Sequence, residues 1–347
     1  MAGKKKDDEE VKQKDPFAAM NEKYGKGSVI LANSKGFDKV KEVTSTGSLT
    51  LDIATGIGGV PKGGKITQII GGESASKTTL SLHIIAEEQK KGNLCAFLDV
   101  EGTYSSEYAT SIGVDESKLY IVNVETFLDK KKESETKAIS GEEWLEILGD
   151  LLDTKQFGII VLDSAAELCP KAELEGGQSY SGIGVMARMM SKGLRTITAK
   201  LLPTNTGLVI LNQYRMSPGK YGDPRVEATG EALKFYTALK IEISKSLDKD
   251  GDGVYGIQVK AKITKSKVSA PYGTASYYVE FGKGIQRIDE IIDLAIEHKI
   301  IKSATGHYSY NEEKLCHGFD KLKQLFIDNS EFATDVECKV LEKLKEI

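Results

Sequence analysis

Short runs of valine and isoleucine alternate with helical patterns between about residues 64 and 280. The strand-like runs ITQII, LCAFLDV and GIIVLDS are separated by the helix-like segments TTLSLHIIAEEQKK and EEWLEILGDLL. Such alternation is typical of a parallel sheet with helices on both faces. The later runs ALKIEI, YGIQVKAKI and SYYVEF follow one another through turns, so some strands at this end should be antiparallel. We therefore expect an α/β fold with a mostly parallel central sheet.

The flanking segments have other patterns. Residues 1–16 are charge-dense and almost free of apolar side chains, which predicts a disordered tail. FAAMNEKYGKG predicts a short helix that needs a partner surface, either on its own core or on a neighbouring subunit. From about residue 284 the pattern becomes helical around a tyrosine-rich hairpin at HYSY, which predicts a small second domain. The segment 128–141 lacks apolar periodicity and is expected to be an exposed insertion.

Composition excludes several classes of protein. No stretch approaches about 18 uninterrupted apolar residues, so we expect a cytoplasmic protein without a membrane span or signal peptide. The net charge of −4 provides no global basic field, so any contact with nucleic acid must be local. Four cysteines without CxxC spacing indicate buried free thiols rather than a disulfide framework or a zinc site. The acidic run LDKDGDGVYG has Val259 where a calcium loop needs glutamate, which favours a hairpin turn.

The segment GGKITQIIGGESASKTTL looks like a phosphate-binding P-loop between a strand and a helix. In such a loop, backbone amides face phosphate oxygens, Lys77 contacts the β- and γ-phosphates, and Thr78 offers its hydroxyl to Mg²⁺. The usual pattern GxxxxGK[ST] has glycine where this chain has Ser76. On this motif alone, a turn capped by the Ser76 hydroxyl is an equal alternative. The residues expected to hold the nucleotide are Gly71, Gly72, Glu73, Ser74, Ala75, Ser76, Lys77, Thr78 and Thr79.

Acidic residues end two further apolar runs. Asp99 and Glu101 end the run FLDVEG, and Asp163 ends the run GIIVLDS. In a parallel sheet, both ends lie at the same edge as the P-loop, where ligands bind. Asp163 therefore suits an Mg²⁺-organising role beside Thr78, and Glu101 is placed to orient a water for attack on the γ-phosphate. This combination favours ATP hydrolysis over simple helix capping.

From about Phe17 to the C-terminus, the chain resembles the bacterial RecA recombinase family. The phrases that carry the resemblance, in the family's order and spacing, are YGKGSVI, STGSLTLDIATGIGGVPKG, ESASKTTL, CAFLDVEG, VLDSAAELCPKAELEG, ARMMSKGLR, LNQYRM, GEALKFY, KITKSKVSAPY and GHYSY. The resemblance implies an N-terminal oligomerisation arm over residues 17–48, a RecA-type P-loop ATPase core over 49–283 and a small α+β C-terminal domain over 284–347. It also implies an ATP- and Mg²⁺-dependent recombinase. Such a protein forms helical filaments on single-stranded DNA and pairs it with a homologous duplex in recombination and repair.

The resemblance assigns roles to residues at the nucleotide. Glu101 would be the catalytic glutamate, Tyr108 would stack on adenine, and Gln213 would couple the γ-phosphate to the DNA loops. Lys265 and Lys267 would reach the ATP held by the adjacent subunit.

Two loops would contact DNA, residues 176–184 and 215–230. Both are glycine-rich, lack periodicity and exceed the usual length of a connection, which independently indicates function. Their cations would contact phosphates, and their apolar side chains would wedge between or stack on bases. The expected DNA-binding residues are Ile183, Arg188, Arg195, Arg215, Met216, Pro218, Lys220, Tyr221, Arg225, Thr229 and Gly230.

Some features depart from the family pattern. The second loop is one residue shorter, with Pro218 where an aliphatic wedge is usual, and the acidic tail of many members is missing, so autoinhibition by a tail is not expected. With Ser76 and the insertion at 128–141, these departures indicate a divergent member, such as a phage-encoded one. Two alternatives stay open. One is a ring helicase with the same core, and the other is a non-hydrolysing filament or mediator protein in which Ser76 has weakened ATP chemistry.

Overall fold

The computed structural model describes residues 17–31, 40, 42–123, 128–129, 132–136, 138–176, 184–217, 224–250 and 253–345. The expectation for residues 1–16 lies outside these ranges. The chain divides into two units, residues 1–39 and 40–347. In the first unit, helix α1 spans Ala18–Tyr24, as predicted, and the apolar residues Phe17, at its N-cap, and Met20 are exposed. The Asn21 side chain accepts a hydrogen bond from the Val29 amide at 2.9 Å and so closes the following turn.

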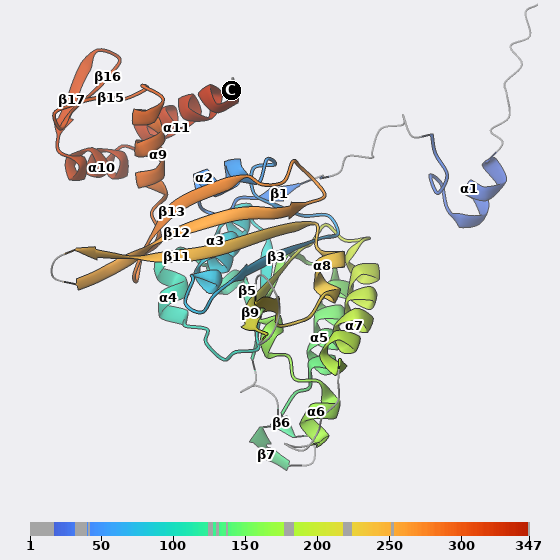
Figure 1. Ribbon diagram of the computed structural model, residues 1–347. Helices are drawn as coiled ribbons and strands as arrows, with labels where there is room; N and C mark the ends of the chain where they lie inside the picture. Colours follow the sequence, from blue (N-terminus) through green and yellow to red (C-terminus); the bar gives the residue numbers. More distant parts are fainter. Residues whose placement is uncertain are drawn as a thin grey trace, which may run out of the picture. The chain divides into compact units, whose positions relative to one another are not determined.

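A single large sheet organises the second unit (Figure 1). Its strand order is β14-β13-β12-β11-β3-β9-β8-β4-β5, and β10 pairs with β9. From β11 to β5 neighbouring strands are parallel, whereas β11 to β14 pair antiparallel. This confirms the predicted α/β fold with antiparallel strands at one end. The strands are β3 Lys65–Gly71, β4 Leu94–Asp99, β5 Leu119–Asn123, β8 Phe157–Asp163, β9 Gly207–Met216, β10 Arg225–Glu227, β11 Leu239–Asp250, β12 Gly253–Ser266, β13 Thr274–Glu280 and β14 Gly284–Ile285.

Helices cover both faces of the parallel strands. Helix α3 (Lys77–Lys90) packs on one face, where Leu80 and Ile84 join a core with Phe97. Helices α5 (Gly141–Thr154) and α7 (Val185–Leu201) pack on the other face through Trp144 and Leu194. Because apolar layers lie on both sides, every residue of β8 is buried, which accounts for its uninterrupted apolar run.

Shorter elements connect this core. They are α2 Leu49–Ala54, α4 Ser106–Ser111, η1 Glu116–Lys118, η3 Ala165–Glu167, α6 Lys171–Gly176, α8 Ala232–Tyr236 and the paired strands β1 Val43–Thr44 and β2 Val60–Pro61. Strands β11 and β12 pair antiparallel as far as Asp250 and Gly253, which agrees with the hairpin predicted there, while residues 251–252 lie outside the described ranges. The insertion at 128–141 contains a small hairpin, β6 Leu128–Asp129 with β7 Lys132–Thr136, that its polar composition did not predict.

The C-terminal domain has its own core. Helices α9 (Arg287–Glu297), α10 (Phe319–Asp328) and α11 (Ser330–Lys345) enclose Ile292, Leu322 and Val336. The hairpin predicted at HYSY is the centre of a three-stranded sheet, β15 Lys302–Ala304, β16 His307–Tyr310 and β17 Glu313–His317. The central sheet continues to Ile285, immediately before α9 begins.

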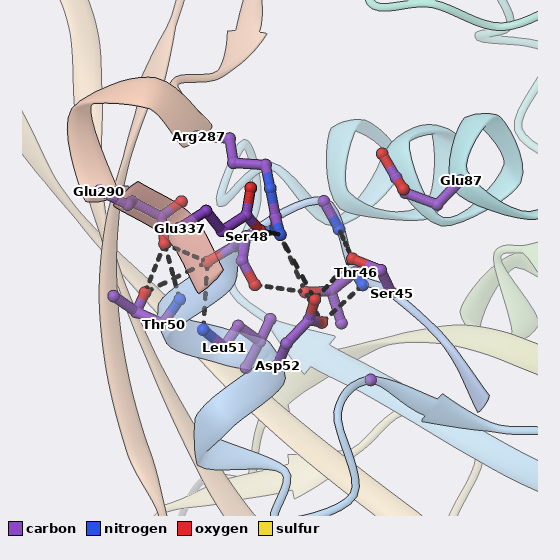
Figure 2. A network of polar contacts seen from close by, with 12 residues as sticks. Ser45, Thr46, Ser48, Thr50, Leu51, Asp52, Glu87, Arg287, Glu290 and Glu337 are labelled. Atoms are coloured by element: carbon purple, nitrogen blue, oxygen red, sulfur yellow. Dashed lines mark hydrogen bonds and ion pairs between the residues drawn. The ribbon is translucent and has the colours of Figure 1, made fainter. Parts of the chain in front are cut away.

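A buried polar network joins this domain to the core (Figure 2). The Glu290 carboxylate on α9 accepts hydrogen bonds from the Ser48 hydroxyl and the Thr50 amide, both at 2.8 Å, and so caps the start of α2. Arg287 pairs with Glu337 at 2.5 Å and lies 3.8 Å from Asp52. Burial raises the pKa of both Glu290 and Asp52.

Two further sequence expectations concern the whole chain. All four cysteines are free, as expected, but only Cys95 is buried; Cys169 and Cys316 are partly exposed and Cys338 is exposed, so the expectation of burial is wrong for these three. Within the described ranges, no helix is long and apolar enough to cross a bilayer.

Candidate nucleotide-binding and active site

The P-loop lies between β3 and α3, as the motif predicted. A Cβ atom on Gly71 would lie 2.6 Å from the Ile243 carbonyl oxygen, so only glycine lets β3 and β11 approach here. The Lys77 ammonium donates to the Gly72 carbonyl at 2.8 Å, which holds the lysine across the loop. Burial lowers the pKa of Lys77, although Asp163 and Glu101 oppose this shift.

Ser76 adopts a left-handed backbone conformation, with φ 64° and ψ 31°. Ser76 is the N-cap residue of α3, but its hydroxyl makes no capping hydrogen bond within the described part of the chain, so the alternative of a turn capped by this hydroxyl is not supported. The conformation also explains the glycine of the usual motif, because an ordinary residue in this region costs about 1 kcal/mol. Serine therefore preserves the path of the loop at a conformational cost.

The register of the sheet brings the acidic residues to the P-loop. Asp99 on β4 is the register partner of Asp163 on β8. The Thr78 hydroxyl donates to Asp163 at 2.6 Å, which places the two expected metal ligands together. Burial raises the pKa of Asp163 to about 6, and the Thr78 hydrogen bond opposes this rise. Asp99 instead accepts from the backbone amides of Thr103 and Tyr104, at 3.0 and 3.1 Å, and stabilises a turn.

Glu101 and Gln213 are in direct contact. Gln213 on β9 donates its side-chain amide to Glu101 Oε1 at 3.0 Å, and Ser164 donates its hydroxyl to the same oxygen at 2.5 Å. Gln213 is also the register partner of Gly71 at the start of the P-loop. The residues expected to act as catalytic glutamate and sensor therefore share one hydrogen bond beside the phosphate-binding loop.

A cavity of about 450 Å³ opens over the P-loop. Tyr108, expected at the adenine, lines it and shares a 2.9 Å hydrogen bond with Thr79. The described lining residues are Glu73, Ser74, Ala75, Ser76, Lys77, Thr78, Thr79, Glu101, Thr103, Tyr108, Asp163, Gln213, Val279, Phe281 and Gly282. The volume and the mixture of two aromatic rings, one lysine, carboxylates and hydroxyls fit a nucleotide bound with a divalent metal.

The sequence missed the lining residues at the end of β13. Phe281 is 54% exposed, and Gly282 accepts a hydrogen bond from Ser111 at 2.9 Å, which ties the β13–β14 turn to α4. A single aromatic residue after a strand is a weak signal. Only the sheet order brings this turn beside Tyr108.

Lys265 and Lys267 contact helix α8 of their own chain. Lys265 donates to the Lys234 carbonyl, and Lys267 donates to the Phe235 carbonyl at 2.8 Å. Neither lysine is among the described residues that line the nucleotide cavity.

The expected DNA-binding residues fall into four groups. Arg188 and Arg195 are exposed on α7, two helical turns apart and therefore on one face. Others are engaged within the chain, since Arg215 donates to the Ala166 carbonyl at 3.0 Å and Arg225 pairs with Glu242 at 3.1 Å. Ile183, Pro218, Lys220 and Tyr221 lie outside the described residues, as do 177–183 of the first loop and 218–223 of the second.

The remaining three lie on the second loop. Met216 is 67% exposed, Thr229 is fully buried and accepts from Asn212 at 3.0 Å, and Gly230 turns the chain with φ 69°.

Comparison with known proteins agrees with this geometry. The family model "RecA N-terminal domain" matches residues 12–286, and "RecA C-terminal domain" matches residues 289–345. The chain belongs to the RecA family. It is 40% identical to Protein RecA of Rickettsia bellii, over 95% of this chain and 92% of the relative. It is 38% identical to Protein RecA of Dichelobacter nodosus, over 93% of this chain and 89% of the relative.

A solved RadB recombinase has the same fold, with a TM-score of 0.51 at 21% identity, over 70% of this chain and 98% of that one. As a RecA-family protein, the chain is an ATP-dependent DNA recombinase with DNA-dependent ATPase activity. The family resemblance seen in the sequence is thereby confirmed.

Proposed function

We propose that this recombinase binds ATP with Mg²⁺ in the P-loop cavity and works as a helical filament on single-stranded DNA. The filament pairs that strand with a homologous duplex, in the cytoplasm where the DNA lies. The observation that carries the proposal is the contact between Glu101 and Gln213 beside the Thr78–Asp163 pair. At this edge of the sheet, the phosphate-binding loop lies beside two side chains whose oxygens can bind a metal and beside a carboxylate that accepts a hydrogen bond.

Each group of residues in the cavity has a separate role toward the nucleotide. The backbone amides of 72–76 and the Lys77 ammonium bind the phosphates. Thr78 and Asp163 would hold Mg²⁺, which, when bound, neutralises charge that develops on the phosphates. Glu101 orients a water in line with the γ-phosphate, while Gln213 senses whether that phosphate is present. Tyr108 and Phe281 contact the base.

Polymerisation and DNA binding extend beyond this cavity. In the filament, Lys265 and Lys267 would complete the nucleotide site of the adjacent subunit. The exposed face of α7 with Arg188 and Arg195, followed by the two loops, would contact DNA phosphates and bases. The arm at 17–48 would pack on the neighbouring subunit, and residues 284–347 would act as an accessory domain.

The Glu101→Gln variant tests this assignment. Glutamine keeps the size of the side chain and its contact with Gln213 but cannot polarise a water as strongly. We expect hydrolysis stimulated by single-stranded DNA to fall at least about tenfold while filaments still assemble. The measurements are ATP turnover with and without single-stranded DNA, followed by negative-stain imaging.

The outcomes separate the candidate functions. Stimulated hydrolysis with filaments in the unmodified protein supports the recombinase, and normal turnover in Glu101→Gln contradicts the role of this glutamate. Rings that separate strands would instead indicate a helicase. Filaments without any hydrolysis would indicate a mediator.

A further inference from the structure

Two ion pairs bind the returning end of the second loop to the sheet. Strand β10 pairs antiparallel with the end of β9. Arg225 on β10 lies 3.1 Å from Glu242 on β11, and Glu227 lies 2.7 Å from Lys240. Residues two apart on a strand share a face, so the two pairs lie side by side. Strand β10 provides the cation of one pair and the anion of the other. We call these four residues the clasp.

The inner pair of the clasp is almost buried. Glu227 is 10% exposed and Lys240 12%. Glu227 also accepts from Gln68 on β3 at 2.7 Å, so its carboxylate joins β10 to two core strands. Removing one partner of such a pair leaves an uncompensated charge in a region of low dielectric, which makes the contact sensitive to substitution.

The outer pair is more exposed and includes an aromatic contact. Arg225 is 48% exposed and Glu242 26%. The Arg225 guanidinium also lies 4.9 Å from the centre of the Tyr214 ring on β9. A substitution at Glu242 therefore weakens the clasp with little risk to the core.

Strand β9 joins the clasp to the nucleotide site through consecutive residues. Gln213 contacts Glu101 through its side chain, and its carbonyl accepts from the amide of Ala228, the residue after Glu227, at 3.0 Å. The next residue, Tyr214, is the register partner of Glu227. These contacts offer a direct route by which a shift of Gln213 at the nucleotide would move the base of the loop.

Strand β11 joins the clasp to the lysines expected to act on the neighbouring subunit. Lys240 is the register partner of Lys265 on β12. Burial and the cations Lys234, Lys240 and Lys267 lower the pKa of Lys265, whereas the negative charge of Glu227 opposes this shift. The clasp thus lies between the nucleotide site of its own chain and the two lysines that are expected to reach the adjacent subunit.

We propose that the clasp couples the second DNA-binding loop to the nucleotide site, so that bound ATP raises the affinity for DNA and bound DNA raises hydrolysis. Glu227, Lys240, Arg225 and Glu242 are positioning residues, which act through Gln213 and the loop. This assigns Arg225, expected from the family resemblance to contact DNA, to the base of the loop. The inference rests on the proposed function.

The test measures coupling directly. Affinity for a single-stranded oligonucleotide is compared with and without a non-hydrolysable ATP analogue, and the ratio is the coupling factor, since the effect of either ligand on the other is reciprocal. We expect Glu227→Gln and Glu242→Gln each to lower this factor at least about fivefold, with analogue affinity in the absence of DNA within about twofold of the unmodified protein. A lower coupling factor at constant analogue affinity is not expected from a merely structural pair.

A charge swap provides the rescue. The double variant Glu227→Lys, Lys240→Glu keeps opposite charges at the two positions. The Gln68 side-chain oxygen, buried without a hydrogen-bond partner among the described residues, can accept from a lysine at position 227. We expect the coupling factor to recover. As a matched control, Lys302→Gln breaks an exposed pair with Glu312 in the C-terminal domain, 2.7 Å apart, and should keep the unmodified factor.

The possible outcomes separate a failure of the proposed function from a failure of the coupling role. If the unmodified protein shows no effect of the analogue on DNA affinity, the proposed function itself fails. If that effect is present and the clasp variants retain it, the coupling role is overturned. It is also overturned if the swap recovers nothing, or if analogue affinity and melting temperature fall together with the coupling factor.

Discussion

At position 76 the backbone adopts φ 64° and ψ 31°, a conformation that glycine reaches more readily than serine. The neighbouring Ser74 is also left-handed, with φ 53°. Both residues line the nucleotide cavity, so their backbone amides are displayed to it by conformations that most residues avoid. The loop therefore keeps its phosphate-binding path although the motif is altered.

We expect Ser76→Gly to raise the free energy of unfolding by up to about 1 kcal/mol, because relief of the left-handed conformation outweighs the entropy of glycine in the unfolded chain. ATP affinity should be equal or better. Ser76→Ala is the matched control, since it removes the hydroxyl but keeps the conformational cost. Urea unfolding and ATP titration measure the two effects. A large loss of ATP affinity in both variants would show instead that the hydroxyl binds phosphate.

At the scale of elements, α3 and β14 meet at a histidine that is only partly exposed. His83 on α3 accepts a hydrogen bond from the Ile285 amide at 2.9 Å, which requires a neutral ring with its proton on the other nitrogen. Burial lowers the pKa of His83 to about 4, although Glu87 opposes this shift. The P-loop helix is thus bound to the last strand of the sheet by a group that acid can charge.

The depressed pKa of His83 predicts a pH dependence of stability. The unfolded chain binds a proton near pH 6.5 and the folded protein only near pH 4, so this contribution is present above pH 6.5 and is lost as the pH falls through that window. The loss should reach up to about 3 kcal/mol of unfolding free energy. Urea unfolding of the unmodified protein and of His83→Gln, between these two pH values, measures it. Identical pH profiles for the two proteins would exclude the effect.

At the scale of the whole molecule, Lys265 and Lys267 donate to the last carbonyls of α8 in their own chain, and neither lines the cavity of that chain. Helix α8 follows the second loop directly, and Phe235 on it is 71% exposed. An exposed aromatic residue beside two lysines and next to the loop expected to contact DNA is suited to a subunit interface. A composite site would make hydrolysis depend on polymerisation.

The double variant Lys265→Ala, Lys267→Ala should bind nucleotide nearly normally as a monomer, because its P-loop is intact, yet show little DNA-stimulated turnover. Mixing it with Lys77→Ala should restore activity where an intact P-loop meets a neighbour with intact lysines. ATP turnover of the mixture, against each variant alone, is the measurement. Mixed filaments that recover nothing would refute action across an interface.

Part of the site could be predicted because some of its residues belong to short, continuous sequence motifs. Lys77 and Thr78 belong to one motif, and Glu101 and Asp163 follow apolar runs whose ends must share an edge in a parallel sheet. Contacts across the sheet were not predictable from pattern. Gln213 meets Glu101 across 112 residues, and Phe281 reaches the nucleotide cavity from the antiparallel end of the sheet.

The sequence by itself determined the alternation of strands and helices, the phosphate loop and the acidic edge, because each depends on residues near one another in the chain. Only the tertiary structure decided which strands are neighbours. The order β11-β3-β9-β8-β4 departs from chain order, and it places Glu227 against Lys240 and Gln68, and Gln213 against Glu101. Such pairings follow from packing and register across the whole sheet, which no local periodicity encodes.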